Sequence, residues 1–558
     1  MKKLVKLLAL FMALYSGNVQ AANNQQLVIG SQQEFDSLNL VLTSMSQSSY
    51  LISMLQRDLV TVDANWKWVP QLATKIPTFE NGLAQKIVDK DGTEKIIATW
   101  EINPKATWGD GTPVTGEDFK LAWQVGICNN VAVPYRESYV RIQAITVDKA
   151  NPKHFSVKYD KADFDYFQVA PFGFLPKHIE GAIFERTKNE MGAYEKQTSY
   201  VTTPTNPGLY FGPYVVQDYK PGSHIVMVPN SHFYGHAPKI QKIIFKVISN
   251  TQALEANLRA GSLDMIGEIG INFDQAMAIE KRAQPTDPFV LQMRPSATYE
   301  HIRLNMSNPL LSDVRVRRGL LYAIDRDKLT KSLFDNRQTK AMHFVHPDDP
   351  YFTDKVTQYP YDLAKANQLF DEAGWKKGAD SYRSKDGQKL SLTIMSTADN
   401  KTRDLVEVYL QDQWKQAGVE LKIKNEPARV FFGDTLQKIK YPHMAMFADV
   451  SAPDMPPKFM VLSKAIPTAA NGYSGQNYSA WNDPKLDAAL QKVLGAFSLS
   501  ERANLMHEII SAYTNDVPAL PLYYRADIAV VPKNLKGFQI TGHQFYSSQN
   551  VEDWDLGQ

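Results

Sequence analysis

Cysteine is nearly absent from this sequence of 558 residues: Cys128 is the only one, so the chain cannot form a disulfide within itself. Long apolar runs are absent too, because no stretch beyond residue 21 approaches the roughly 18 apolar residues that a membrane-spanning helix needs. Neither sign of charge is in excess, since 61 Lys and Arg nearly balance 59 Asp and Glu. These absences predict no stable membrane insertion and no electrostatic preference for nucleic acid.

Signatures of common enzyme classes are also missing. The chain has no Gly-x-x-x-x-Gly-Lys-Ser/Thr loop, which argues against an ATPase. Residues 472–475 (GYSG) lack the second glycine of a nucleophile elbow, and Cys128 follows a predicted helix directly, where a buried thiol is expected. The sequence therefore predicts no catalytic residue, no metal ligand and no cofactor. A periplasmic hydrolase stays an alternative, because paired carboxylates cannot be recognised from sequence.

The first 21 residues form a segment of their own. Three lysines precede an apolar stretch at residues 7–15, and Val-Gln-Ala follows at residues 19–21. This order is typical of a secretory signal peptide. No cysteine stands at the cleavage point to carry a lipid anchor. The sequence predicts a periplasmic protein, exported by this signal peptide and not a lipoprotein.

The stretch at residues 304–329 (LNMSNPLLSDVRVRRGLLYAIDRDKL) predicts a turn followed by two helices. Asn308 and Pro309 form the turn, Ser312-Asp313 offers an N-cap, and apolar residues then recur every four positions at Val316, Leu320 and Ile324. Asp325 can cap a second helix. The stretch predicts the start of a new lobe just past the middle of the chain.

Two further segments carry local signals. In residues 107–118 (TWGDGTPVTGED), Asp110-Gly111 favours a tight turn, and Thr115 with Asp118 forms a capping box for a helix. Near residues 390–423, an alternating strand, a helix over 401–417 and a second alternating strand follow one another. Strand, helix, strand predicts a parallel crossover, so the second lobe is expected to be α/β.

These motifs, taken in order, resemble the family 5 extracellular solute-binding proteins, the peptide receptors of ABC importers. The match includes residues 107–118, the glycine, proline and tyrosine series between residues 212 and 264, residues 304–329, and YDLAKANQLFDEAG at residues 361–374. The resemblance covers roughly residues 27–537. It implies an α/β fold, a two-lobed periplasmic binding protein of the Venus-flytrap type, class II, with an extra subdomain in the first lobe.

The resemblance also implies a division of the chain. Lobe I is expected to consist of residues 22–66, 190–293 and 521–558, with the extra subdomain at residues 67–189. Lobe II is expected at residues 294–520. The implied function is capture of oligopeptides in an interlobe cleft by hinge closure, by a monomer that delivers them to ABC permease subunits. The alternatives are a non-peptide ligand such as an oligosaccharide, a metal chelate or an opine, and a role in sensing or peptidoglycan recycling.

Five residues are candidates for ligand binding by this resemblance. Peptide receptors of the family hold the positive amino terminus of the ligand with an aspartate after a tryptophan, and residues 446–457 (MFADVSAPDMPP) correspond to that segment. Phe447 replaces the tryptophan, and either Asp449 or Asp454 is the anchor, with Asp449 favoured. Glu34 matches a family glutamate near the start of the chain. Arg403 lies further along than the arginine of dipeptide receptors, which favours longer peptides or another ligand.

Two histidines stand close together at His343 and His346, before a Pro-Asp-Asp-Pro sequence. They are open to two interpretations, a contact to a ligand or a solvated loop, and the sequence favours the solvated loop.

Overall fold

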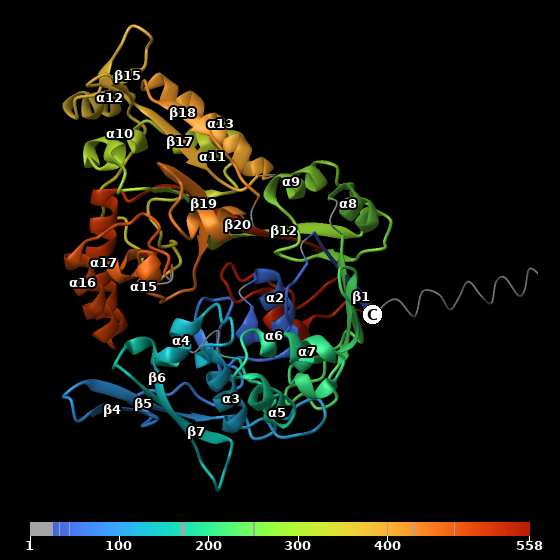
Figure 1. Cartoon of the computed structure of the whole chain (residues 1–558). Coiled ribbons are helices and arrows are strands. Elements are labelled where there is room, and N and C mark those ends of the chain that lie inside the picture. The colour runs from blue at the N-terminus through green and yellow to red at the C-terminus, as the bar shows by residue number, and fades with distance from the viewer. Residues whose placement is uncertain are drawn as a thin grey trace, which may run out of the picture. The chain divides into compact units, whose positions relative to one another are not determined.

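The computed structural model describes residues 26–557 except 33, 44, 169–172, 249–250, 399, 428–429, 472 and 474. The predicted signal peptide, residues 1–21, lies outside the described residues. The chain divides into two compact units. Unit 1 contains the residues up to Met293, Asp527–Thr541 and Phe545–Gln558, and unit 2 contains Arg294–Ala526 and Gly542–Gln544. Two long strands, β12 (Phe289–Leu304) and β20 (Ala519–Pro532), run from one unit into the other (Figure 1).

Unit 1 is built on a mixed sheet around β1 (Gln26–Ser31), whose Leu27, Val28 and Ile29 are buried. β1 pairs in parallel with β10 (Lys242–Val247) and with β11 (Met265–Ile266). Antiparallel strands β9 (His224–Pro229) and β8 (Tyr214–Lys220) extend the sheet beyond β10. The helices of this part are α2 (Ser46–Leu55), α8 (Thr251–Arg259) and α9 (Phe273–Lys281).

A second, antiparallel sheet of unit 1 has the order β4, β5, β7, β6 and lies within residues 67–189 (Figure 1). Helix α3 (Gly116–Ile127) begins at the predicted capping box: Asp118 Oδ2 accepts the backbone N–H of Thr115 at 2.7 Å. Phe119 of α3 packs on Phe155 of β7, with ring centroids 5.0 Å apart. The remaining bounds are β4 (Ala84–Val88), β5 (Glu94–Glu101), β6 (Ile142–Val147), β7 (His154–Tyr159), α4 (Arg136–Val140), α5 (Lys177–Thr187), α6 (Ala193–Gln197), α7 (Ser199–Thr202), and the pair β2 (Val60–Val62) and β3 (Trp68–Pro70).

Unit 2 contains a mixed sheet of order β18, β17, β19, β12, β20. β17 (Ser391–Met395) and β18 (Glu420–Ile423) are parallel and are joined by α13 (Lys401–Gln416), as the crossover prediction required. Val406, Leu410 and Trp414 of α13 are fully buried. Strand β19 (Met444–Val450) pairs in parallel with β17 and antiparallel with β12. The α/β prediction for this lobe is therefore confirmed.

The helices at the start of unit 2 begin where their caps predict. Asp313 accepts the N–H of Arg315 at 2.8 Å and starts α10 (Val314–Tyr322), and Asp325 accepts the N–H of Lys328 at 2.8 Å and starts α11 (Arg326–Phe334). Helix α12 (Leu363–Glu372) has Ala373 as its C-cap, and Gly374 follows with a φ of +88°, which glycine adopts without strain. The small strands are β13 (Thr339–Lys340), β14 (Lys376–Lys377), β15 (Arg383–Lys385) and β16 (Gln388–Lys389).

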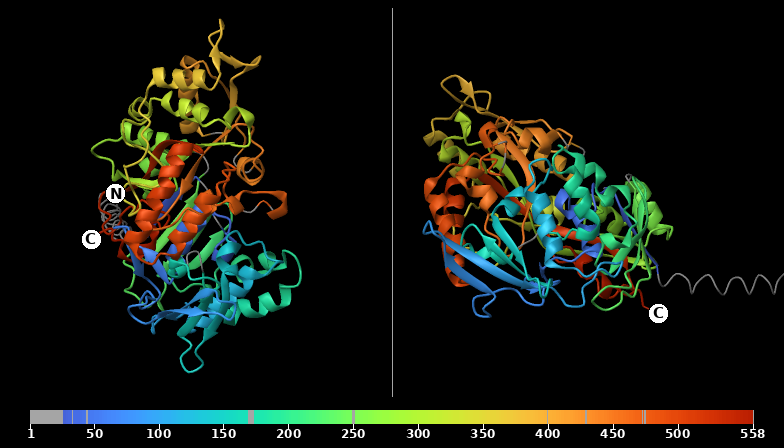
Figure 2. Two further views of the ribbon diagram at one scale, coloured as in Figure 1. Left: turned by 90° about the vertical axis from the view of Figure 1, so that its left-hand side faces the viewer. Right: turned by 60° about the horizontal axis from the view of Figure 1, so that its bottom comes forward.

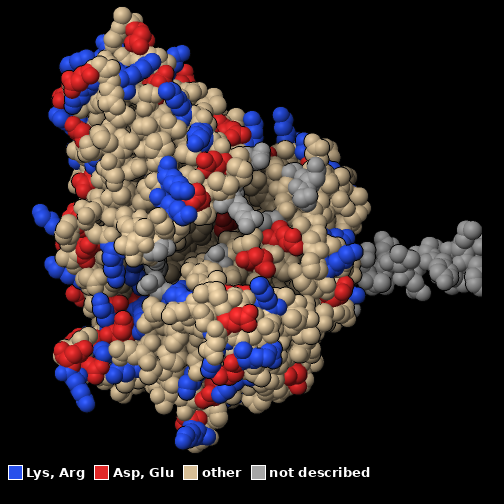
Figure 3. All heavy atoms as spheres, viewed as in Figure 1, with Lys and Arg blue, Asp and Glu red and all other residues tan. Residues whose placement is uncertain are grey.

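The last two long helices of unit 2 are α16 (Pro484–Gly495) and α17 (Leu499–Asp516), which lie side by side (Figure 2). Unit 2 also contains a short helix, α15 (Lys458–Val461), and a π-helical turn at Phe431–Leu436. On the face drawn in Figure 3, lysines and arginines are interspersed with aspartates and glutamates. Within the described part of the chain, no helix combines the length and the apolar character that crossing a bilayer requires.

Candidate ligand-binding site

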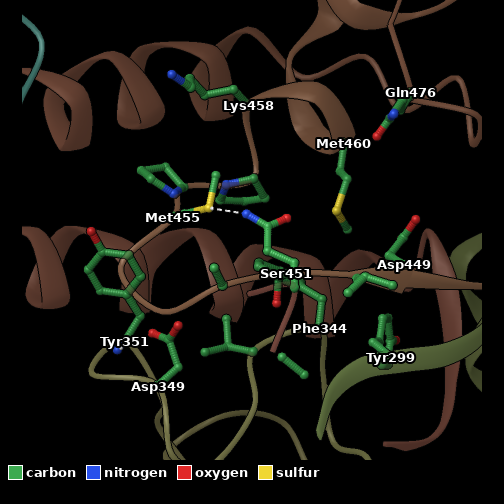
Figure 4. Close-up of a pocket in the computed structure, with 17 residues that line it drawn as sticks. Tyr299, Phe344, Asp349, Tyr351, Asp449, Ser451, Met455, Lys458, Met460 and Gln476 are labelled. Carbon is green, nitrogen blue, oxygen red and sulfur yellow. Dashed lines mark hydrogen bonds between the residues drawn. The ribbon is translucent and has the colours of Figure 1, made fainter. Parts of the chain in front are cut away.

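Unit 2 contains a cavity of about 130 Å³ beside the middle of β12 and the end of β19 (Figure 4). The residues that line it come from two strands, two loop segments and two separate glutamines. Ala297 and Tyr299 come from β12, and Asp449 and Val450 end β19. The loop after β13 and the segment leading into α15 supply most of the rest, with two glutamines from elsewhere: Phe344, Val345, Asp349, Tyr351, Ser451, Ala452, Met455, Pro456, Pro457, Lys458, Met460, Gln476 and Gln544.

The register between β12 and β19 decides which side chains face the cavity. Tyr299 is opposite Asp449, and His301 is opposite Phe447. Alternate residues of a strand share a face, so Tyr299, His301 and Arg303 lie on the same face of β12. On the same face of the sheet, the neighbouring strand β19 contributes Phe447 and Asp449. Of the residues on this face, Tyr299 and Asp449 reach the cavity lining, whereas His301, Arg303 and Phe447 do not.

Asp449 is held by an arginine beneath it. Arg303 Nη2 donates to Asp449 Oδ2 at 2.6 Å, and the side chain of Arg303 is 1% exposed against 19% for Asp449. The Arg303 cation is thus fixed below the carboxylate, while the carboxylate itself keeps an exposed side toward the cavity. A charge-assisted pair of this kind fixes the direction in which Asp449 points.

His301 lies next to the same carboxylate but does not bind it. Its Nδ1 is 3.0 Å from the carbonyl oxygen of Tyr299, which can only accept, so Nδ1 carries a proton. Burial and the charge of Arg303 lower the pKa of His301 to about 4, so the ring is neutral and Nε2 has no proton. Nε2 lies 3.5 Å from Asp449 Oδ2 and cannot donate to it. Arg303 is therefore the side chain that positions Asp449.

Phe447 lies outside the cavity lining. Its side chain is 2% exposed and belongs to a buried cluster with Met395, Phe431 and Tyr478. The rings of His301 and Phe447 meet edge to face with centroids 4.7 Å apart. In this structure, Phe447 supports the strand that carries Asp449.

Asp454 forms a buried ion pair on a different element. It adopts a positive φ of +57°, and its two oxygens contact Arg502 of α17 at 3.2 and 2.7 Å. The hydroxyl of Tyr351 donates to the same carboxylate. Asp454 is not among the residues that line the cavity. Of the two aspartates proposed as the anchor, Asp449 is the one at the cavity.

Arg403 lies on the other side of β12. Its Nε donates to Glu300 Oε1 at 2.8 Å and its Nη1 donates to the hydroxyl of Thr397 at 2.8 Å. Glu300 is fully buried and also pairs with Arg525, whose Nε lies 2.8 Å from Oε2. Burial alone would raise the pKa of Glu300, but the two arginines outweigh it and lower the pKa to about 2. Arg403 thus compensates a buried charge of the fold.

Glu34 belongs to unit 1. It is exposed, and its Oε1 accepts the backbone N–H of Gly222 at 2.6 Å. The structure therefore brings only Asp449, of the five predicted residues, to the cavity of unit 2. A ligand contact by any of the five stays a prediction.

The two histidines at 343 and 346 are buried, at 0% and 4% exposure, so the solvated-loop interpretation is wrong. The loop folds inward because His343 Nε2 lies 2.8 Å from the carbonyl oxygen of Thr353 and the ring of His346 packs against Tyr524. Burial lowers the pKa of both histidines to about 4, so both are neutral. Their chain neighbours Phe344 and Val345 line the cavity.

Several cavity residues were not recognised from the sequence. Asp349 and Tyr351 lie in the same inward-folded loop, and Tyr299 depends on pairing between strands about 150 residues apart. Asp349 is the most informative of them. It is 9% exposed, and its described hydrogen bonds come from two backbone N–H groups, of Tyr351 at 2.8 Å and of Asp454 at 3.3 Å. Burial, with a contribution from Asp454, raises its pKa to about 7.

Comparison with known proteins gives consistent matches along the chain. The family model described as bacterial extracellular solute-binding proteins, family 5 Middle, matches residues 67–467. Oligopeptide-binding protein AppA of Bacillus subtilis (strain 168) is 25% identical over 589 aligned residues, which cover 100% of this chain and 98% of the relative.

Solved structures give the same result. The oligopeptide binding protein of Thermus thermophilus, solved with a pentapeptide, is 26% identical with a TM-score of 0.78, and the match covers 95% of this chain and 96% of that one. NikZ of Campylobacter jejuni, solved with Ni(L-His), is 24% identical with a TM-score of 0.75 over 95% of this chain and 99% of that one. The latter similarity shows the fold alone. With a family model that matches most of its length, this chain belongs to the bacterial extracellular solute-binding proteins of family 5.

Proposed function

We propose that this chain captures oligopeptides in the periplasm and delivers them to an ABC importer. The observation that carries the proposal is the full-length similarity to an oligopeptide-binding protein solved with a pentapeptide, at 26% identity and a TM-score of 0.78. The curated relative AppA, which this chain matches from end to end, is named for the same ligand class.

The cavity of unit 2 supports a peptide ligand. It combines apolar side chains, two carboxylates and two glutamines, which is the mixture expected where a few polar groups orient a largely apolar ligand. Asp449 faces it as an anion held in place by Arg303. We infer that Asp449 binds the positively charged amino terminus of the peptide, because a charge-assisted hydrogen bond to a pre-positioned carboxylate is strong and directional.

Several finer points belong to the same proposal. The chain is exported by its signal peptide, carries no lipid, acts as a monomer, and passes its ligand to the permease subunits of the importer. It binds without catalysis. Capture by closure of two lobes about their connecting strands is part of the proposal and follows from the resemblance.

The test is mass spectrometry of the small molecules released when the protein, purified from its native host under mild conditions, is denatured. A set of peptides is expected, and their lengths define the range that the site accepts. The matched control is the Asp449→Asn variant, purified in parallel, which should retain fewer peptides if Asp449 binds the amino terminus. A single non-peptide mass, such as an oligosaccharide, a metal chelate or an opine, would overturn the peptide assignment while leaving the family unaffected.

A further inference from the structure

Asp349 carries a buried carboxyl group at the cavity. None of the described lysine, arginine or histidine side chains forms an ion pair with it, and its oxygens accept only backbone N–H groups. Three other acids of unit 2 differ in this respect: Asp449 pairs with Arg303, Asp454 with Arg502, and Glu300 with two arginines.

The surroundings explain why this carboxyl group is costly to ionise. Burial is the larger effect and the nearby charge of Asp454 adds to it, so the pKa of Asp349 rises to about 7. The titratable groups around it are Asp454 with its partner Arg502, Tyr351, and Tyr524 of β20. A buried carboxylate without a counter-ion is stabilised strongly when a cation is brought beside it.

Asp349 and Asp449 lie at different ends of the cavity, with Phe344 between them (Figure 4). The ammonium nitrogen of Lys458 lies at the upper edge of that view, away from both carboxyl groups. A ligand group that contacts Asp349 is therefore a different group from one that contacts Asp449. Lys458, the lysine of the lining, is not a counter-ion of Asp349.

The walls near Asp349 suit the stem of a long side chain. Tyr351, Phe344 and Val345 are buried neighbours in the loop, and Met455 and Pro456 also line the cavity. Figure 4 shows Met455 across the cavity from Phe344. Lysine and arginine place their methylene groups along apolar surface and their charge at the end. The volume of about 130 Å³ is close to that of an engineered protein cavity of about 150 Å³ that admits benzene, so it suits one side chain.

We propose that the end of this cavity beside Asp349 takes a lysine or arginine side chain of the bound peptide, with Asp349 as its counter-ion. The inference rests on the proposed function and adds a preference of the site for basic peptides. Asp349 is then a specificity-determining residue. Asp449 remains available to the amino terminus of the same peptide.

The experiment compares matched peptides by calorimetry at pH 7. Tetrapeptides carry lysine at one position at a time, and each has a partner in which norleucine, of similar length and without charge, replaces that lysine. The full mature protein should prefer lysine by at least about tenfold at one position, or roughly 1.4 kcal/mol. The Asp349→Asn variant should lose this preference and bind the norleucine peptides as the unaltered protein does.

Asp348→Asn is the control, because Asp348 is the exposed neighbour of Asp349, its side chain is 57% exposed, and it does not line the cavity. This variant removes the same charge one residue away and should keep the lysine preference.

Acetylation of the peptide's amino terminus separates the two sources of positive charge, which are the lysine side chain and the amino terminus. If Asp349 binds the side chain, acetylated peptides keep the lysine preference. If acetylation abolishes the effect of Asp349→Asn, Asp349 pairs with the amino terminus and not with a side chain, and the proposal is overturned.

Proton release gives a second readout that needs no variant. Binding of a cation beside Asp349 should expel part of a proton at pH 7, since the pKa of the free carboxyl group is about 7. Calorimetry in two buffers of different ionisation enthalpy should detect this release for the preferred lysine peptide and not for its norleucine partner. Equal affinity for lysine and norleucine peptides overturns the inference while the peptide function holds. No binding of any peptide overturns both.

Discussion

Replacing Glu300 with glutamine should destabilise unit 2 in a way that depends on pH. Glu300 is fully buried between Arg403 and Arg525, and removing its charge leaves two arginines facing each other. The arginines lower its pKa to about 2, compared with 4.5 for an ordinary glutamate. This difference of about 2.5 corresponds to about 3 kcal/mol of stability at pH 7. Removal of one partner of a buried ion pair typically costs about 3–5 kcal/mol, which agrees.

The sign of the pH effect follows from the depressed pKa. The stabilisation is fully present above pH 4.5 and is lost as the pH falls toward 2, because the folded protein must then take up the proton that the unfolded chain already holds. The difference between the unaltered protein and Glu300→Gln should therefore shrink from about 3 kcal/mol at pH 7 to about 1 kcal/mol at pH 3.

Differential scanning calorimetry measures both effects. For a unit of this size, about 3 kcal/mol lowers Tm by about 6–12 °C. Asp434→Asn is the control, because Asp434 pairs with Lys438 and Lys440 on the surface of the same unit and should leave Tm where it is. A difference in Tm that is equally large at pH 7 and at pH 3 would refute the electrostatic reasoning, and so would the absence of any loss at pH 7.

Three further changes give defined outcomes. Asp449→Ala should weaken peptide binding at least about tenfold, or roughly 1.4 kcal/mol, in calorimetry; unchanged affinity would remove Asp449 from the binding site. Arg502→Met should lower the free energy of unfolding by about 3–5 kcal/mol, because the buried Asp454 loses its cation, and an unaltered denaturation curve would contradict this. Burial raises the pKa of Glu268 in unit 1 to about 8, so stability should fall as the pH rises from about 5 to 8. Glu268→Gln should flatten that slope in thermal denaturation; equal slopes would show that Glu268 is not its source.

Local signals in the sequence were sufficient to predict much of the fold. The caps at Asp313 and Asp325 act within three residues of themselves, so the sequence around each aspartate contains the whole interaction. The capping box at Thr115 and Asp118 and the crossover through α13 are local in the same sense. Periodicity and capping describe short-range energetics, and these elements were predicted for that reason.

The site depends on contacts that no local pattern records. Arg303 and Asp449 are 146 residues apart, and only the register of β12 against β19 brings them together. The loop after β13 is polar in sequence, and its burial follows from distant partners such as Tyr524, whose hydroxyl donates to the carbonyl oxygens of His343 and Val345. Asp349 was missed because its burial is a property of that folded loop.

One wall of the cavity comes from the end of the chain. Residues Gly542–Gln544 belong to unit 2 although the chain on both sides of them belongs to unit 1. The carbonyl oxygen of Gly542 accepts the N–H of Ala297 at 2.8 Å, and Gln544 Nε2 lies 3.4 Å from Met455 Sδ. Gly542 adopts φ of +77°, and a Cβ there would lie 2.7 Å from the carbonyl oxygen of Pro295. A chain that stops before Gly542 therefore lacks this wall of the cavity, however well its remaining residues fold.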